Sequence, residues 1–388
     1  MGTDDTHNGR LAVLGADNRA HCFAFIRRHG QQSITELAAH TKLSRPTVRT
    51  HIDAMKDMGL LHETEQPSQS QGGRPAASFT INASAAYLAV FDISKHEHRY
   101  LLCDISGTIR RALVKDVPGD LSIPQREALI EADLKELAET AAVPQEAIQR
   151  FSGSVGTQVS SAGAILEYAD NVALLDDNFA KRLHAPVTLE NDLKAASYAE
   201  HHIGCAQGVD NLVYTLAWHR VAAGIVLGGK IHRGFHDLAG ELNLITSTDP
   251  TQDFAQDWND WPTFLQVLKN AEGGSTKAQR SVKAFCQAAG TQTAFLAMSI
   301  DPEMIVLGGP LVHRSPYFVE EITSVLDQLL GNTPGIDIRL SQLRSWGPAL
   351  GAALKGMEAL ETALIGAPSL EHTLRNTTDV EIPLPVKH

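Results

Sequence analysis

Residues 33–61, SITELAAHTKLSRPTVRTHIDAMKDMGLL, decide how the N-terminal part of the chain folds. Ser33 and Glu36 form the S-x-x-E pattern of a capping box, which predicts that a short helix begins there. Residues 41–43 interrupt the apolar pattern, so we expect this helix to end in a turn. A second helix follows at once, and two short helices joined by a turn are typical of a helix-turn-helix.

The second helix begins after Ser44, which can cap it, and Pro46 is tolerated in its first turn. Val48, Ile52 and Met55 recur at the spacing of one apolar stripe and are expected to be buried. The exposed side of such a helix reads a DNA major groove, with the residues near the helix start closest to the bases. We therefore predict DNA contacts from Ser44, Arg45, Thr47, Arg49 and Thr50. The alternative is an ordinary three-helix unit with solvated arginines on its surface.

A β-hairpin is expected after this helix. Residues 60–61 and 78–81 fit its two strands, and the polar residues 63–71 with GGRP (72–75) fit the tip between them. A winged helix has such a hairpin, and an arginine on an extended tip suits the narrow, strongly negative minor groove. Arg74 is therefore a further candidate DNA contact, although the same residues also fit an interdomain linker.

The composition is that of a cytoplasmic protein with two or three globular units. The chain has 388 residues, and 43% of them are hydrophobic, which is enough for sizeable cores. No run of about eighteen apolar residues occurs, and the polar first ten residues do not resemble a signal peptide. The four cysteines are scattered singly, so neither a disulfide framework nor a zinc site is expected from them.

The charge is unevenly distributed along the chain. The formal net charge is −12, which argues against a protein that binds nucleic acid over its whole surface. Residues 1–85 contain nine Lys/Arg and eight Asp/Glu, so this part has a net charge of +1 and the rest of the chain has −13. A near-neutral DNA-binding head on an acidic body fits a regulator whose body does not touch phosphate.

Two β-meanders organise the rest of the chain. The first is expected over residues 87–114 and the second over residues 211–232, and helices and further strands follow each of them. This repetition predicts an α/β body of two duplicated lobes with a cleft between them. The expected segments are 1–10 disordered, 11–82 winged helix-turn-helix, 83–190 first lobe, 191–365 second lobe and 366–388 loose tail.

Polar residues gather where one buried strand ends. Residues 186–189 (PVTL) predict that strand, and Glu190, Asn191 and Asp192 follow it directly. Ligand sites of α/β proteins lie at the carboxyl ends of strands, so these three residues are candidate ligand contacts. Asn191 and Asp192 could equally cap the helix that begins there.

Four ordered segments carry a family resemblance. They are LENDLKAASYAEHHIGCAQG (189–208), IVLGGKIHRGFHDLAGEL (225–242), DPEMIVLGGPL (301–311) and GPALGAAL (347–354). Together with a winged helix ending in GGRPA, they resemble the ROK family of repressors and sugar kinases, over residues 11–365. The resemblance implies a winged helix-turn-helix attached to an actin-like, hexokinase-like body of the ribonuclease H-like type. It also implies a dimeric or tetrameric transcription factor that responds to a sugar or sugar phosphate.

The kinases of that family have two phosphate-binding loops, and neither is intact here. The first, D-x-G-G-T, corresponds to residues 92–96 (DISKH), which contain no glycine. The second, G-x-G-x-G, corresponds to residues 218–224 (WHRVAAG), where bulky side chains replace glycine. Glycines let backbone N–H groups approach phosphate, so we expect neither ATP binding nor kinase activity. Asp192 matches the general base of the kinases, and without a phosphate donor it could only bind.

The structural zinc site of the family is also missing from the sequence. Neither a histidine shortly after Gly240-Glu241 nor a C-x-C-G-x-x-G-C cluster is present, so we expect no zinc. Carboxylates and amides pair with vicinal hydroxyls, which favours a sugar derivative or another metabolite as ligand. Glu241 could instead be a helix-start acid. The candidate ligand-binding residues that remain are Asn171, Glu190, Asn191, Asp192 and Glu241.

These features together predict a sequence-specific transcriptional regulator that represses a set of metabolic genes. We expect a homodimer or homotetramer on a palindromic double-stranded DNA operator, without membrane contact. A metabolite in the interlobe cleft would shift DNA binding by its different affinity for two lobe closures. The alternatives are a ROK-type sugar kinase with a DNA-binding head and a regulator controlled by a partner protein.

Overall fold

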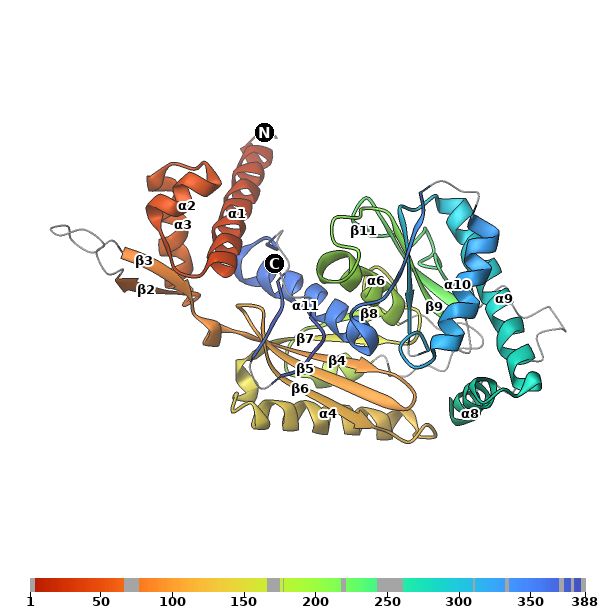
Figure 1. The fold of residues 1–388 in the computed structure, drawn as a ribbon. Coiled ribbons are helices and arrows are strands. Elements are labelled where there is room, and N and C mark those ends of the chain that lie inside the picture. Colours follow the sequence, from red (N-terminus) through yellow and green to blue (C-terminus); the bar gives the residue numbers. More distant parts are fainter. Residues whose placement is uncertain are drawn as a thin grey trace. The chain divides into compact units, whose positions relative to one another are not determined.

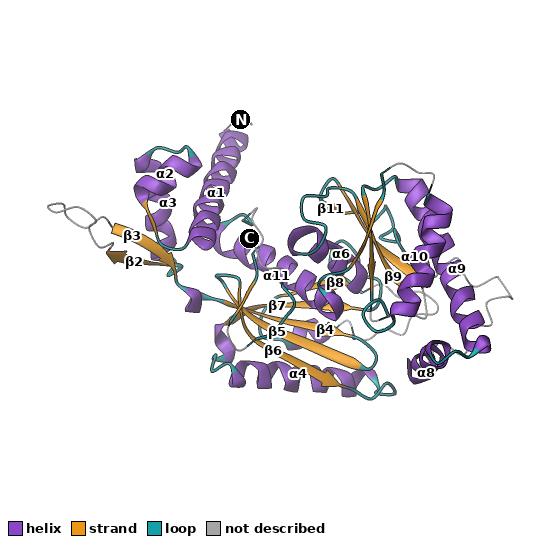
Figure 2. Cartoon of the chain, in the orientation of Figure 1, coloured by secondary structure: helices purple, strands orange, loops and turns teal. Residues whose placement is uncertain are grey.

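A computed structural model divides the chain into two compact units, whose elements are drawn in Figures 1 and 2. It describes residues 4–65, 77–165, 175–176, 178–217, 221–242, 261–309, 311–331, 335–369, 373–377 and 380–384. The first unit comprises Met1–Gly153, Ala173–Leu189 and Ala352–Ile382. The second unit comprises Ser154–Val172, Glu190–Gly351 and Pro383–His388.

The first unit begins with three helices and a small antiparallel sheet, which we call the head. The helices are α1 (Asp4–His29), α2 (Ile34–Thr41) and α3 (Arg45–Asp57). The strands are β1 (Gln32–Ser33), β2 (Leu61–Glu65) and β3 (Ala77–Ile81), in the order β1-β3-β2. The predicted helix-turn-helix and the two strands of the predicted wing are therefore confirmed, but residues 63–65, which were predicted in the tip, belong to β2 because they pair with β3.

The capping signals and the apolar stripe explain where α2 and α3 begin and what they bury. Ser33 and Glu36 form the predicted capping box, and Lys42 ends α2 in a left-handed conformation. Ser44 caps α3, and Pro46 lies in its first turn. The predicted core residues Val48, Ile52 and Met55 are fully buried. Burial of these three side chains stabilises the head by roughly several kcal/mol, which is far more than either cap contributes.

Contrary to the expectation of disorder over residues 1–10, α1 begins at Asp4. Its second half supplies buried residues, among them Phe23 and Ile26. Once that half is fixed by packing, each residue added toward the N-terminus gains a backbone hydrogen bond without a new nucleation step.

The other part of the first unit is a six-stranded sheet in the order β14-β6-β5-β4-β7-β8. Its strands are β4 (Tyr87–Ile93), β5 (Glu97–Asp104), β6 (Thr108–Asp116), β7 (Ile148–Val155), β8 (Val187–Asn191) and β14 (Arg375–Asn376). The first three form the predicted antiparallel meander. Helix α4 (Ile123–Thr140) packs on β5 and β6, and α5 (Phe179–Arg182) precedes β8. Short 3-10 helices occupy Ala83–Ala85 and Gln145–Ala147.

The segment after residue 366 is not the loose tail that we predicted. Strand β14 pairs in parallel with β6, and Val380 and Ile382 are buried. Prolines 383 and 385 suggested disorder, but the apolar side chains before them give the segment a face to bury. Ala352–Ile382 also belongs to the first unit rather than to the second lobe, because Ser152 Oγ donates to Ala352 O at 2.7 Å.

The second unit is built on a five-stranded sheet in the order β11-β10-β9-β12-β13. Its strands are β9 (Leu212–Ala217), β10 (Val221–Leu227), β11 (Lys230–Ile231), β12 (Met304–Gly308) and β13 (Asp337–Leu340). Its helices are α6 (Asp192–Ile203), α8 (Trp261–Glu272), α9 (Thr276–Ile300) and α10 (Pro316–Leu330). The 3-10 helix Arg344–Trp346 precedes α11 (Gly347–Ile365), which continues into the first unit.

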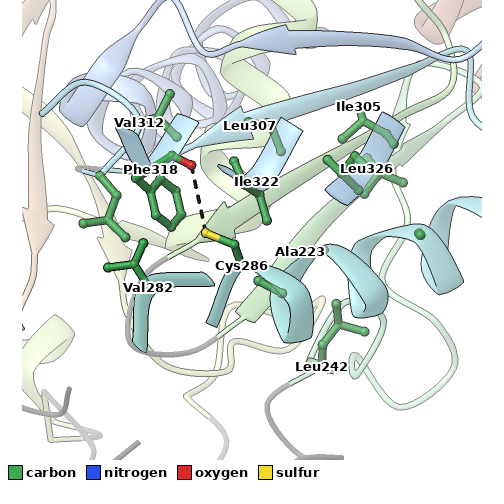
Figure 3. Packing of buried hydrophobic residues seen from close by; sticks show 14 of the residues in the cluster. Ala223, Leu242, Val282, Cys286, Ile305, Leu307, Val312, Phe318, Ile322 and Leu326 are labelled. Atoms are coloured by element: carbon green, nitrogen blue, oxygen red, sulfur yellow. Dashed lines mark hydrogen bonds between the residues drawn. The ribbon is translucent and has the colours of Figure 1, made fainter. Parts of the chain in front are cut away.

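Both faces of this sheet are buried, as alternation along its strands requires. On β12, Ile305 and Leu307 pack with α9 and α10 around Cys286 and Phe318, as Figure 3 shows. Met304 and Val306, which point the other way, pack with the first turn of α6. The sheet thus fixes α6, and the polar residues at its start, on a rigid support.

The described residues contain neither a disulfide bond nor a candidate membrane-spanning helix. All four cysteines are free and buried, and burial raises the pKa of the Cys22 thiol to about 11. Within these same ranges, no helix has the length and apolar content that crossing a lipid bilayer requires.

Candidate nucleic-acid interface and ligand site

The start of α3 is held by its own hydroxyl groups. Ser44 Oγ accepts from Thr47 N at 3.2 Å and lies 2.7 Å from Thr47 Oγ1. Thr50 Oγ1 donates to Pro46 O at 3.1 Å, so its lone pairs remain available to a donor. Ser44 and Thr50 are exposed and Thr47 is half-buried. These three predicted contacts therefore stabilise the helix start whether or not DNA is bound.

The two predicted arginines of α3 take no part in its cap, and the Arg49 charge adds to that of Lys56 in lowering the pKa of the Glu63 carboxyl. Arg45 and Arg49 are exposed and stand one helical turn apart, so both lie on one side of α3. Within the described part of the chain, neither makes an ion pair. Two solvated guanidinium groups beside a helix N-terminus, where the dipole is positive, form a surface that attracts phosphate.

The hairpin after α3 is tied to that helix. Strands β2 and β3 pair from Leu61 with Ile81 to Glu65 with Ala77. Lys56 of α3 forms an ion pair with Glu63 of β2, which lowers the pKa of the Glu63 carboxyl. The wing therefore has a fixed base on α3. Its tip, residues 66–76 with the predicted contact Arg74, lies outside the described residues.

The predicted ligand residues meet at the carboxyl end of β8. Phe151 N donates to Pro186 O, and Asn191 Nδ2 donates to Thr157 O at 3.0 Å, so β7 and β8 run in the same direction. Asn191 Oδ1 accepts from the backbone of Leu193 and Lys194. The capping alternative is thus confirmed for Asn191, and Asp192 is the first residue of α6.

Two cations, which sequence reasoning missed, neutralise the predicted carboxylates. Arg233 donates to both carboxylate oxygens of Glu190, with Nη1 to Oε1 at 3.0 Å. Lys194 Nζ lies 3.6 Å from Glu241 Oε1 and donates to Asp237 O at 3.2 Å. Glu190 and Lys194 are at most 2% exposed, so each charge needs its partner. The loop from Arg233 to Glu241 is thereby fixed to the start of α6.

Asp192 differs from the other two acidic residues of this site. Its side chain is half-buried, and Oδ1 accepts from Leu193 N at 2.8 Å. The ion pairs of Arg233 and Lys194 are with Glu190 and Glu241. Asn171, the remaining predicted ligand residue, lies outside the described residues.

The loop after β7 contributes polar groups that sequence reasoning also missed. Thr157 and Gln158 are at most 3% exposed. In the described part of the chain, Thr157 Oγ1 and both amide atoms of Gln158 lack a hydrogen-bond partner. Leaving a buried donor or acceptor unpaired costs about 1–3 kcal/mol, so such groups favour a site that accepts a polar ligand.

The turn that replaces the first phosphate loop uses two of its backbone donors for its own hydrogen bonds. Ser94 N donates to Glu97 O at 3.1 Å, and Glu97 N donates to Ser94 Oγ at 3.2 Å. Arg126 donates to the carbonyls of Ser94 and Lys95 from behind. Backbone N–H groups that close a turn are not directed at a phosphate. The second loop position, residues 218–220, lies outside the described residues.

A buried hydrogen-bond chain supports this turn. Arg126 Nη1 donates to His98 Nε2 at 3.0 Å, so Nδ1 carries the proton and faces Tyr100 OH at 3.1 Å. Tyr100 OH in turn donates to Asp133 Oδ2 at 2.8 Å. Burial, with the Arg126 charge added, lowers the pKa of His98 to about 4. His98 is therefore neutral at pH 7.

No cluster of three His, Cys, Asp or Glu side chains placed to hold a metal ion occurs among the residues that the structure describes. The pattern of the ROK family matches residues 166–251 and 242–355, and that of the bacterial regulatory protein arsR family matches residues 25–63. The chain belongs to the ROK family. The second match covers α2 and α3 and agrees with the helix-turn-helix described above.

Two curated relatives of this ROK chain are repressors. The xylose repressor of Bacillus subtilis (strain 168) is 22% identical over 57% of this chain and 58% of its own length. The chain therefore matches little more than half of that relative. The DNA-binding transcriptional repressor Mlc of Escherichia coli (strain K12) is 20% identical over 89% of this chain and 94% of its own length.

Solved structures agree on the fold. A ROK family transcriptional regulator, homologous to the Mlc protein of E. coli, superposes with a TM-score of 0.70 at 18% identity. That match covers 91% of this chain and 98% of the other. Sugar kinases of the family share the fold of the body as well. The expected architecture, a helix-turn-helix head on an actin-like, hexokinase-like body, is therefore confirmed.

Proposed function

We propose that this ROK protein is a sequence-specific, DNA-binding transcriptional repressor of metabolic genes in the cytoplasm. The observation that carries the proposal is the capped helix α3, which exposes Arg45 and Arg49 on one side, where neither forms an ion pair with another described residue. A helix with a buried apolar stripe and a basic exposed face fits a major groove. Arg74, on the tip of the wing, would add a minor-groove contact.

A homodimer or homotetramer on a palindromic operator is part of the proposal. A two-fold assembly places two copies of α3 on one side of the duplex, separated by a whole number of helical turns. The two relatives named above are repressors, which supports repression as the role of this chain.

The proposed effector is a small polar metabolite, either a sugar derivative or another intermediate. Thr157 Oγ1 and the amide of Gln158, which lack a partner in the described part of the chain, would bind it together with the Asp192 carboxylate. Glu190 and Glu241 would contribute through Arg233 and Lys194, which already hold them. Asn191 would fix the loop that carries Thr157, and Asn171 would add an amide.

Sugar kinase activity is the alternative that the site supports less well. A kinase needs backbone donors for the nucleotide phosphates, and in the turn Ser94–Glu97 the N–H groups of Ser94 and Glu97 are already bonded within the turn. We therefore propose a regulator without ATP or zinc as a cofactor. Asp192 would be a ligand contact rather than a general base.

Selection of bound fragments from genomic DNA with the purified chain tests this function. We expect a palindrome upstream of a coherent set of metabolic genes, and those genes define the metabolites to be tried as effectors. Asp192→Asn should keep operator affinity but weaken the response to the effector found in this way. The absence of any enriched site at moderate salt would contradict the proposal, and ATP-dependent phosphorylation of a sugar would support the kinase.

A further inference from the structure

A buried ion pair joins α1 of the head to α11 of the body within the first unit. Arg27 and Glu361 form this pair, and their side chains are at most 3% exposed. Arg27 Nη1 also donates to Ser369 Oγ at 3.1 Å, and Glu361 Oε2 accepts from Ser369 N at 2.6 Å. Two buried charges that satisfy each other in this way tolerate little displacement, because separation leaves each of them unpaired.

Further contacts fix the same end of α1. Arg375 Nη2 donates to Arg27 O at 2.6 Å, and Arg19 Nε donates to Ile365 O at 3.2 Å. Helix α1 itself packs against α2 and α3. Arg27 Nη2 also donates to Ile105 O at 3.4 Å. The position of α3 relative to the rest of the first unit is therefore set through α1 by α11, the segment that follows it and the turn at Ile105.

The opposite end of α11 touches the helix that begins at the candidate ligand site. A Cβ on Gly351 would lie 1.9 Å from Ala195 O, and one on Gly347 would lie 3.4 Å from Ala196 Cβ. The backbone of α11 thus rests directly on the backbone of the first turns of α6. On another side, a Cβ on Gly224 would lie 2.3 Å from Leu193 O.

Backbone contacts of this kind leave no flexible side chain to absorb a shift. Close-packed elements move as rigid pieces, so a displacement at the start of α6 is passed to α11. Helix α11 is continuous from Gly347 to Ile365 and includes both Gly351 and Glu361. Its two ends therefore report on the ligand site and on the head.

We propose that α11 couples the effector site to DNA binding, and that the Arg27–Glu361 pair is the joint on the side of the head. The proposal rests on the function proposed above, because it needs an operator and an effector site. Arg27 and Glu361 are positioning residues, since neither belongs to the exposed face of α3. An effector that shifts the start of α6 would change operator affinity through this pair.

A double-mutant cycle tests the coupling without knowledge of the effector. Gly351→Ala places a methyl group against Ala195 O and so displaces the α6–α11 contact. Its effect on the affinity for the selected operator is measured in the wild-type chain and in Glu361→Gln, under conditions where every variant is folded. We expect Gly351→Ala to change operator affinity by at least fivefold in the wild-type chain and by less than twofold in Glu361→Gln.

Glu358→Gln is the matched control, because Glu358 lies on the same helix and accepts from Lys355 Nζ at 2.6 Å. In the Glu358→Gln chain, Gly351→Ala should change operator affinity by the same factor as in the wild-type chain. An equal change in the Glu361→Gln background, or no change in any background, overturns the proposed coupling. If Gly351→Ala does not fold, Ala196→Val disturbs the same contact less severely and is judged in the same way. A wild-type chain that binds no operator refutes the proposed function itself.

Discussion

The exposed face of α3 and the carboxyl end of β8 hold their charged residues in opposite ways. Arg45 and Arg49 are solvated and make no ion pair in the described parts of the chain. Glu190 and Glu241 are paired with Arg233 and Lys194. The arginine charges of the first surface are open to ions or molecules from outside the chain. The carboxylate charges of Glu190 and Glu241 are already neutralised by residues of the chain itself.

This difference teaches which substitutions separate function from stability. A solvated arginine loses little when it is removed, so its contribution appears only in binding. A buried carboxylate that holds a guanidinium group is part of the folded structure, so its removal appears first in the free energy of unfolding. At β8, a ligand that uses Glu190 or Glu241 must therefore displace an existing ion pair.

The largest expected effect is that of Glu190→Ala. The change leaves Arg233 without its partner and Asn191 N without an acceptor, so the free energy of unfolding should fall by about 3 kcal/mol. Urea unfolding measures it. Asp337→Ala, which removes an exposed partner of Arg339, should change the same quantity by less than about 0.5 kcal/mol. Equal losses for both variants would remove the contrast drawn here.

A comparable effect is expected from acid, through His98. The folded state holds this imidazole neutral with a pKa of about 4, below its ordinary value of 6.5. Between these two values the unfolded state binds the proton first, so stability falls by about 3 kcal/mol as pH drops through the window. Urea unfolding of the wild-type chain and of His98→Gln at pH 4.5 and 7 measures this loss. Identical pH dependence in the two chains would show that His98 has no part in it.

Arg49→Ala should weaken operator binding by about 2 kcal/mol, or roughly thirtyfold, because a base or phosphate contact is lost. The melting temperature should stay within about one degree of the wild-type value, since Arg49 makes no ion pair in the described chain. Fluorescence anisotropy and calorimetry measure the two quantities. Unchanged affinity would exclude Arg49 from the DNA interface and move the assignment to another surface.

The smallest expected effect separates the two roles of Ser44. Ser44→Ala removes the cap of α3 and should lower the free energy of unfolding by about 1 kcal/mol. Ser44→Asp keeps a capping oxygen, so the unfolding free energy should be preserved, but its negative charge should repel DNA phosphate. Thermal unfolding and operator binding of both variants distinguish these roles. If Ser44→Asp binds operator as tightly as wild type, Ser44 is remote from the DNA.

Local sequence signals predicted the head well because they act over a few residues. Ser33 and Glu36 are three positions apart, and the stripe of Val48, Ile52 and Met55 follows from helix geometry alone. The polar residues at the carboxyl end of β8 could be predicted in the same way, because the end of a strand is a local feature of the sequence. Neither prediction required knowledge of partners that are distant in the sequence.

The partners of the ligand-site residues could not be predicted in this way. Arg233 lies 43 positions from Glu190, and no spacing rule links them. The burial of Lys194 follows from packing of α6, which a helical pattern of charged and apolar residues does not reveal. The segment around Arg375 was misjudged for a similar reason, because its partner strand β6 is more than 250 residues away in the sequence. Non-local pairing, rather than weak propensity, limited these predictions.

The Arg27–Glu361 pair also has a consequence for the making of the protein. Its two residues are separated by 334 positions, so Arg27 emerges from the ribosome long before its partner is translated. Helices α2 and α3 can fold early from local contacts, but the buried ion pair that holds α1 cannot form until α11 is complete. A chain that ends before α11 therefore leaves the buried Arg27 charge without its carboxylate partner.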